Sequence, residues 1–144
     1  MAAATDTELA TRLRLAVSRL HRRIRLVTND VPPLQLSTLV SIEQYGPLRL
    51  GELAQREAVT APTMTRVLAA LDERALIVRS PDPDDARSVR VALSEAGREA
   101  LEHVRSRRTA LLDARLARLT VRQREDLFAA LPALEALVTE EFDR

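Results

Sequence analysis

The chain has 144 residues, a length suited to one domain or to a small domain with a dimerisation extension. It contains no cysteine and only two histidines, His21 and His103, which excludes disulfides and cysteine-based zinc sites and argues against any metal site. All 22 basic residues are arginine and 21 residues are acidic, so the net charge of +1 provides no bulk attraction to a polyanion.

The first predicted element is an amphipathic helix over residues 5–29. Apolar side chains recur there at steps of three and four residues, and Thr5 with Glu8 fits a capping box at its start. The following Val31-Pro32-Pro33 ends the helix, because proline disfavours helical backbone in the residue before it. The polar face is rich in arginine, which is typical of a solvated surface, and its members are Arg12, Arg14, Arg19, Arg22, Arg23 and Arg25.

Three further helices and a short strand are predicted before residue 75. Their ranges are 35–44 for the first helix, 48–50 for the strand, and 52–57 and 61–74 for the other two helices. Thr60 is a suitable N-cap for the last of these, and Pro62 is accommodated in its first turn. The small and apolar positions expected to pack the last two helices together are Leu53, Ala54, Val59, Met64, Val67 and Leu68.

A β-hairpin and two long helices complete the predicted elements. Residues 76–79 are β-branched and apolar, residues 80–85 have loop composition, and residues 89–93 alternate apolar and polar side chains. Helical periodicity returns at Ser94, and Thr120 with Gln123 forms a second capping box that opens the final helix, which Pro132 should kink. The apolar stripe of that helix is Leu127, Leu131, Leu134, Val138 and Phe142.

Residues 48–93 follow the plan of a winged helix-turn-helix, in which the second of two short helices enters the DNA major groove. Two helices and a tight turn alone also fit a structural helical hairpin. The β-hairpin favours the winged plan, because its arginines Arg79, Arg87 and Arg90 suit insertion of a guanidinium into a minor groove. The arginine face of residues 5–29 then has a second interpretation, as a contributor to the potential that attracts DNA. Candidate contacts on the recognition helix are Thr60, Ala61, Pro62, Thr63, Thr65 and Arg66, of which Arg66 can bind guanine through two hydrogen bonds.

These residues resemble the MarR family of winged-helix transcription regulators. Residues 53–54, 59–66 and 76–79 resemble its helix-turn-helix, and residues 83–87 and 89–97 resemble its wing and the start of its next helix. The resemblance implies that Arg87 enters the minor groove and that Asp85 holds an arginine in place. It also implies a mainly α fold with a small β-wing, organised as one domain over 1–144. In that plan residues 34–93 are the winged helix-turn-helix DNA-binding lobe, and residues 5–30 and 94–144 are N- and C-terminal dimerisation helices.

Two positions depart from the family pattern. The family often has Leu-Gly in the turn of its helix-turn-helix, where this chain has Glu57-Ala58. It often has glycine before the first wing strand, where this chain has Ala75. A left-handed turn at Ala75 costs roughly 1 kcal/mol relative to glycine, which a packed domain tolerates. The departures therefore concern local geometry rather than the fold.

The first helix and the last two carry apolar stripes that the small helix-turn-helix core leaves uncovered, which favours burial against a second copy. A two-fold dimer places two recognition helices ~34 Å apart, so its operator is a near-palindrome. We therefore expect a sequence-specific regulator of transcription that binds double-stranded DNA as a homodimer and acts as a repressor. The chain has no signal-peptide pattern and no apolar run of the ~20 residues that cross a bilayer, so we expect it in the cytoplasm.

The resemblance also implies a ligand pocket between the dimerisation helices and the DNA-binding lobe, often for small aromatic acids. Only Tyr45, Phe128 and Phe142 are aromatic, so an aromatic lining is not evident, and His21 with nearby arginines is the candidate for receiving a carboxylate. Release from DNA by a small-molecule effector and regulation without any effector both stay open. We expect no cofactor and no enzyme activity, since no nucleophile pairs with a base. The alternative function is a winged-helix protein–protein interaction module without specific DNA binding.

Overall fold

The computed structural model describes residues 5–27 and 30–139. The chain divides into two compact units, Met1–Arg108 and Thr109–Arg144. Thr28, Asn29 and Phe142, which the sequence assigned to predicted helices, lie outside the described residues. Within the described ranges, no helix combines the length and the apolar character needed to cross a membrane.

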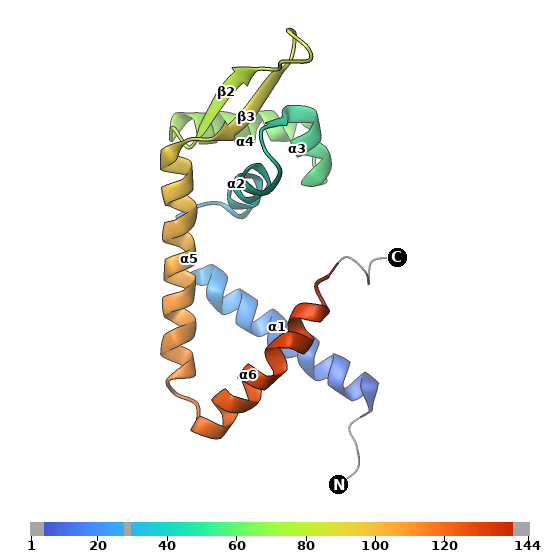
Figure 1. The fold of residues 1–144 in the computed structure, drawn as a ribbon, viewed down its shortest axis with the longest axis vertical. Coiled ribbons are helices and arrows are strands. Elements are labelled where there is room, and N and C mark those ends of the chain that lie inside the picture. Colours follow the sequence, from blue (N-terminus) through green and yellow to red (C-terminus); the bar gives the residue numbers. More distant parts are fainter. Residues whose placement is uncertain (1–4, 28–29, 140–144) are drawn as a thin grey trace. The chain divides into compact units, whose positions relative to one another are not determined.

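The first unit contains five helices, the last of which runs on into the second unit, and one small antiparallel sheet within the described ranges. The strands lie in the order β1-β3-β2, so Val91 of β3 is opposite Leu48 on one side and opposite Arg79 on the other. Figure 1 shows β2 and β3 side by side in the wing. This arrangement confirms the predicted mainly α fold with a β-wing. The elements are α1 (Asp6–Leu26), α2 (Pro33–Tyr45), β1 (Leu48–Arg49), α3 (Leu50–Arg56), α4 (Ala61–Glu73), β2 (Ile77–Pro81), β3 (Val89–Leu93) and α5 (Glu95–Leu116).

A hydrophobic core joins α2, α3, α4, the sheet and the start of α5. Five of the six positions predicted to pack α3 against α4 are buried, and Val59 is half-buried against the same core. By contrast, no residue of α1 is buried, although all of α1 is described. The large side chains that are completely or almost completely buried are Leu39, Leu53, Met64, Leu68, Leu71, Val91, Leu101 and the polar Thr38.

Helix boundaries near β1 differ from the prediction for a capping reason. The sequence suggested a strand over 48–50 and a helix from residue 52, but β1 ends at Arg49 and α3 begins at Leu50. The Arg49 N–H donates to the Glu52 carboxylate at 2.8 Å, which satisfies a free donor at the helix start. The predicted N-cap Thr60 is confirmed, since its hydroxyl accepts the Thr63 N–H at 3.3 Å.

Both departures from the family pattern adopt left-handed backbone. Ala58, in the turn between α3 and α4, has φ 52°, and Ala75, between α4 and β2, has φ 56°. The left-handed turn expected at Ala75 is thus present, without the glycine that would relieve it. Close to it, Gly97 lies so near the start of β2 that an added Cβ would approach the Leu76 carbonyl oxygen to 2.1 Å. Only glycine lets α5 begin this close to the strand.

The second unit contains the end of α5 and the helix α6 (Val121–Ala136). The predicted capping box is confirmed: the Thr120 hydroxyl accepts the Gln123 N–H at 3.1 Å, and the Gln123 side chain accepts the Thr120 N–H at 3.0 Å. The helix continues through Pro132, and no residue of α6 is buried. Large apolar side chains on it are exposed, Phe128 to 76%.

Candidate nucleic-acid interface

The start of α4 presents an exposed polar surface. Ala61, Pro62, Thr65 and Arg66 are exposed, and Thr63 is half-buried. Helix geometry turns these side chains away from the core face, which is formed by buried residues such as Met64 and Leu68 at steps of three and four.

Two of the threonine hydroxyl protons at the start of α4 are already used in local hydrogen bonds. The Thr60 hydroxyl donates to the Thr63 hydroxyl at 3.0 Å, and the Thr65 hydroxyl donates to the Ala61 carbonyl at 3.0 Å. Arg66 forms no ion pair with any described residue. Its guanidinium is therefore the strongest donor available on this helix to an external acceptor, such as a guanine edge or a phosphate.

Arg79 of β2 is not equally available. Its Nη2 lies 2.7 Å from the Asp72 carboxylate, and its Nε donates to the same carboxylate at 2.9 Å. Because Asp72 belongs to the last turn of α4, this pair ties the wing to the recognition helix. The structure thus places Arg79 at a junction within the unit, where two of its three guanidinium nitrogens already contact Asp72.

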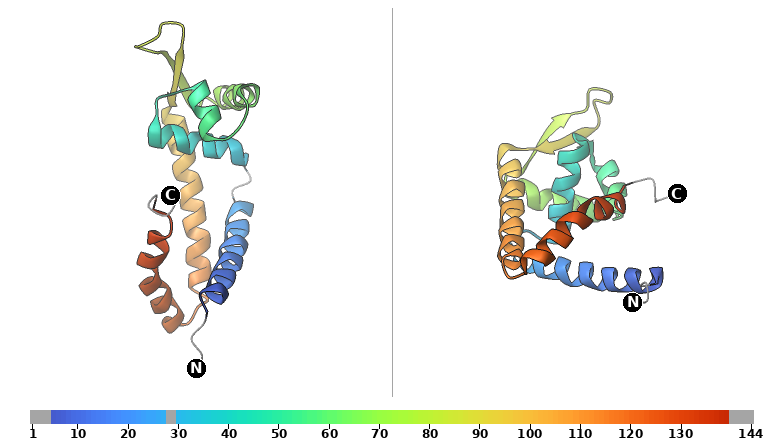
Figure 2. Two further views of the ribbon diagram at one scale, coloured as in Figure 1. Left: turned by 90° about the vertical axis from the view of Figure 1, so that its right-hand side faces the viewer. Right: turned by 60° about the horizontal axis from the view of Figure 1, so that its bottom comes forward.

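Arg87 lies in the loop between β2 and β3, and its side chain is 94% exposed. The Asp85 carboxylate accepts the Arg87 backbone N–H at 3.0 Å and the Ser88 hydroxyl at 3.2 Å, while the Arg87 Nε is 3.6 Å from it. Asp85 therefore fixes the loop backbone and only loosely constrains the guanidinium. The loop extends away from the helices of this unit, which suits contact with an external partner (Figure 2).

Arg90 of β3 is held by two acids that the sequence did not assign to it. Its Nε is 3.2 Å from the Asp82 carboxylate and its Nη2 is 3.2 Å from that of Asp84. Asp82 also accepts a hydrogen bond from the Nε of Arg49 in β1. Sequence reasoning treated Asp82 as an ordinary loop residue and did not single out Arg49. Their contact joins positions 33 residues apart, which no local pattern reveals.

Glu57, one of the departures from the family pattern, links α2 to the turn before α4. The Ser37 hydroxyl donates to its carboxylate at 2.5 Å and the Ser41 hydroxyl donates to it at 2.6 Å. Both serines lie on α2, one helical turn apart. The bridge fixes the end of α3 and hence the position of Ala58, from which the chain enters the recognition helix.

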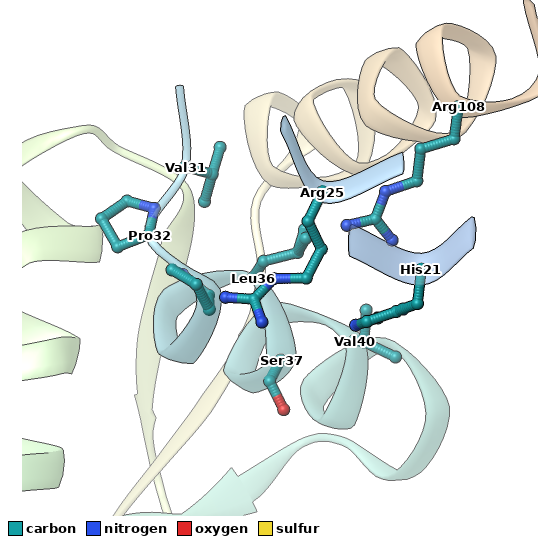
Figure 3. Close-up of a pocket in the computed structure, with 9 residues that line it drawn as sticks. His21, Arg25, Val31, Pro32, Leu36, Ser37, Val40 and Arg108 are labelled. Carbon is teal, nitrogen blue, oxygen red and sulfur yellow. The ribbon is translucent and has the colours of Figure 1, made fainter. Parts of the chain in front are cut away.

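A pocket of about 430 Å³ lies over α2. Three basic side chains, His21, Arg25 and Arg108, gather on one side of it, opposite the α2 residues Leu36, Ser37 and Val40 (Figure 3). The lining contains no acidic residue, and its full set is His21, Arg25, Val31, Pro32, Pro33, Leu36, Ser37, Val40 and Arg108. Of the arginines close to His21 in the sequence, Arg25 lines this pocket, whereas Arg108 of α5 was not part of the prediction.

Comparisons with known proteins agree with this geometry. Residues 31–89 match the model of the MarR family. The chain is 40% identical over 138 residues to an HTH-type transcriptional regulator of Mycobacterium tuberculosis, covering 94% of this chain and 96% of the relative. A transcriptional regulator from Thermotoga maritima has a similar structure, with a TM-score of 0.83 at 25% identity over 96% of this chain and 99% of that one.

A mutant of MepR from Staphylococcus aureus, solved bound to an oligodeoxyribonucleotide, has the same fold, with a TM-score of 0.68 over 91% of this chain and 98% of that one. At 21% identity this likeness concerns the fold alone. The relationship to the mycobacterial regulator extends over nearly the whole of both chains. This relationship confirms the prediction that the chain is a transcriptional regulator and not an enzyme. The chain belongs to the MarR family of helix-turn-helix transcriptional regulators.

Proposed function

We propose that this regulator is a cytoplasmic repressor, which binds a near-palindromic operator in double-stranded DNA as a homodimer. The observation that carries the proposal is the pairing of two exposed guanidinium groups in one unit, Arg66 on α4 and Arg87 on the wing. In winged-helix proteins the recognition helix reads base edges in the major groove while a wing contacts a neighbouring minor groove. A protein of the same fold, MepR, binds an oligodeoxyribonucleotide.

Exposed apolar surface supports the homodimer. On α1, Leu9 is 60% and Val17 55% exposed, and on α6, Val121 is 62% and Phe128 76% exposed. Exposed apolar side chains of this kind on a helix mark a protein–protein contact, and a two-fold axis makes one such surface complementary to itself. Two recognition helices about 34 Å apart then face successive turns of one groove. A dimer bound across a promoter blocks RNA polymerase, which is the basis of the proposed repression.

Salt dependence tests the wing contact. Each Arg87 that neutralises one phosphate-like charge contributes roughly 0.9 to the slope of log affinity against log salt, so Arg87→Ala should lower the slope by about 2 per dimer. The preference for A·T-rich flanks should fade too, because narrow A·T tracts attract arginine.

The measurement is fluorescence anisotropy on operators found by genomic footprinting, with matched A·T- and G·C-rich flanks. Arg74→Ala is the control, since Arg74 is an exposed arginine at the opposite end of α4. An unchanged slope with unchanged flank preference for Arg87→Ala would show that the wing does not touch DNA.

The pocket over α2 is the proposed site of an effector, a small organic carboxylate. Its charged lining is entirely basic among the described residues, which favours an anion. Ser37 has a single hydroxyl proton, which it donates to Glu57. An anion in the pocket that accepts this proton removes one of the two hydrogen bonds holding Glu57, and so loosens the turn that leads into α4.

A titration with salicylate, benzoate and short aliphatic carboxylates tests the effector. We expect the wild-type protein to lose operator affinity as the effective acid is added, and Arg25→Met to require more of it. Arg23→Met is the control, since Arg23 lies on the same helix and does not line the pocket. If none of these acids weakens DNA binding by the wild-type protein, the carboxylate proposal fails while the DNA-binding proposal stands.

A further inference from the structure

Two arginines lie directly opposite each other at the base of the wing. Arg49 of β1 and Arg90 of β3 are register partners in the antiparallel pair. Like charges in this position repel each other and destabilise a sheet, unless an anion lies between them. The pair therefore requires a compensating group.

Asp82, at the end of β2, is that group. Its side chain is fully buried and its carboxylate accepts hydrogen bonds from Nε of Arg49 and lies 3.2 Å from Nε of Arg90. The same carboxylate accepts the backbone N–H of Asp84 at 2.8 Å. The hydrogen bond from Arg49, followed by those from Asp84 and Arg90, keeps the pKa of Asp82 far below its usual value, so the group is ionised at any working pH.

Asp82 directly follows β2 in the chain, and its contacts reach β1, β3 and the loop. Its backbone N–H donates to the Ser88 carbonyl at 3.0 Å, which closes the loop, and the Ser88 N–H donates to Asp85 at 2.9 Å. The backbone of the segment that carries Arg87 is thus connected through Asp82 to β1, which leads directly into α3. This carboxylate links the loop to β1 and β3, in addition to the Arg79–Asp72 pair that ties β2 to α4.

We propose that Asp82 is a positioning residue for DNA binding, which aims Arg87 by joining Arg49 and Arg90. This inference rests on the proposed contact between the wing and DNA. The direction of the expected change in DNA affinity separates this role from a simple charge effect. Removing an acid from a DNA-binding surface should strengthen binding to the polyanion, because less repulsion remains. Loss of Asp82 should instead weaken it.

The experiment compares Asp82→Asn with Asp84→Asn in anisotropy titrations on one operator duplex. Both variants remove one negative charge from the same loop, but the Asp84 side chain is 76% exposed and meets only the outer nitrogen of Arg90. We expect Asp82→Asn to weaken binding by roughly threefold to thirtyfold, the range for residues that act through a network, and Asp84→Asn to leave binding equal or tighter. Thermal unfolding of both variants checks that the fold is intact.

A double-mutant cycle with Arg87→Ala gives the readout that a general loss of stability would not produce. In the Arg87→Ala background, Asp82→Asn should have little further effect on affinity, because the side chain that it positions is gone. If Arg87→Ala alone leaves affinity and salt slope unchanged, the proposed wing contact is wrong. If Arg87→Ala weakens binding but Asp82→Asn behaves like Asp84→Asn, the positioning role is overturned and the wing contact survives.

Arg90→Lys keeps the inference testable should Asp82→Asn fail to fold. The substitution conserves charge, but one ammonium cannot reproduce the guanidinium fork that contacts Asp82 and Asp84 together. We expect weaker operator binding with a shallower salt slope, because a misdirected Arg87 loses its contact with the phosphates. Unchanged affinity for Arg90→Lys would contradict the proposed role of the network.

Discussion

Ala75 occupies the turn between α4 and β2 with φ 56°, in the left-handed region. An L-residue with a Cβ pays about 1–2 kcal/mol to adopt this conformation, whereas glycine adopts it readily. Glycine also increases the entropy of the unfolded chain, which costs about 0.4–1 kcal/mol. Subtracting this entropy cost from the relief of left-handed strain predicts that Ala75→Gly raises the free energy of unfolding by roughly 0.5–1 kcal/mol. The melting temperature should rise by about 2–5 °C.

Nothing else at this position opposes the gain. Ala75 is exposed, so its methyl group contributes little burial. Its backbone N–H donates to the Asp72 carbonyl at 2.9 Å and its carbonyl accepts the Ser94 hydroxyl at 2.6 Å, and both bonds survive the substitution. Ala58, with φ 52° in the other turn, should respond to glycine in the same direction.

Ala69→Gly is the matched control. Ala69 is exposed within α4, where the same chemical change should cost about 1 kcal/mol because glycine disfavours a helix interior. Urea denaturation followed by circular dichroism measures all variants at one protein concentration, since dimerisation would otherwise shift apparent stability. A loss of stability for Ala75→Gly equal to that for Ala69→Gly would refute the reasoning.

Three further predictions concern binding, assembly and acid stability. Arg66→Ala should weaken operator binding by roughly 1–3 kcal/mol and relax preference at one base pair per half-site; competition with base-substituted duplexes measures this, and unchanged preference would remove Arg66 from base recognition. Phe128→Asp should increase the monomer fraction at micromolar concentration in sedimentation velocity, and an intact dimer would place the interface elsewhere. The pKa values of Asp82 and Glu43 are lowered, mainly by hydrogen bonds from arginine, so the folded state binds fewer protons than the unfolded state. The free energy of unfolding should therefore fall as pH drops below about 4, measured by urea denaturation, and a flat profile would contradict it.

Local signals in the sequence were sufficient for most of the fold. Thr60 and Thr120 were recognisable as N-caps because a cap acts within three residues of itself, and both hydrogen bonds are present. Alternation in residues 89–93 matches β3, since the strand buries one face only. The left-handed turn at Ala75 was anticipated from the resemblance, because the family often has glycine at this position, and the φ of 56° confirms it.

The partners of the arginines could not be predicted, because they depend on how distant segments pack. Charge alone does not distinguish Arg79, Arg87 and Arg90, and only the family resemblance singled out Arg87 as the arginine that enters the minor groove. Packing distinguishes them: Arg79 pairs with Asp72, Arg90 is held between two acids, and Arg87 extends outwards. Their contacts with DNA stay predictions, and the structure gives the three residues different expected roles.

The different pairing of these arginines with acids explains how a chain with a net charge of +1 can present an exposed guanidinium to DNA. The three acids at the wing, Asp82, Asp84 and Asp85, would repel phosphates if they faced outwards. Asp82 is buried between Arg49 and Arg90, and Asp85 is turned towards the loop backbone, so much of the acidic charge is compensated within the wing. At the tip the guanidinium of Arg87 is 94% exposed, and the exposed acid Asp84, at 76%, is paired with Arg90. The loop acids, whose negative charge alone would oppose DNA binding, thus hold the wing in shape. Net charge is therefore a poor guide to where this regulator binds DNA.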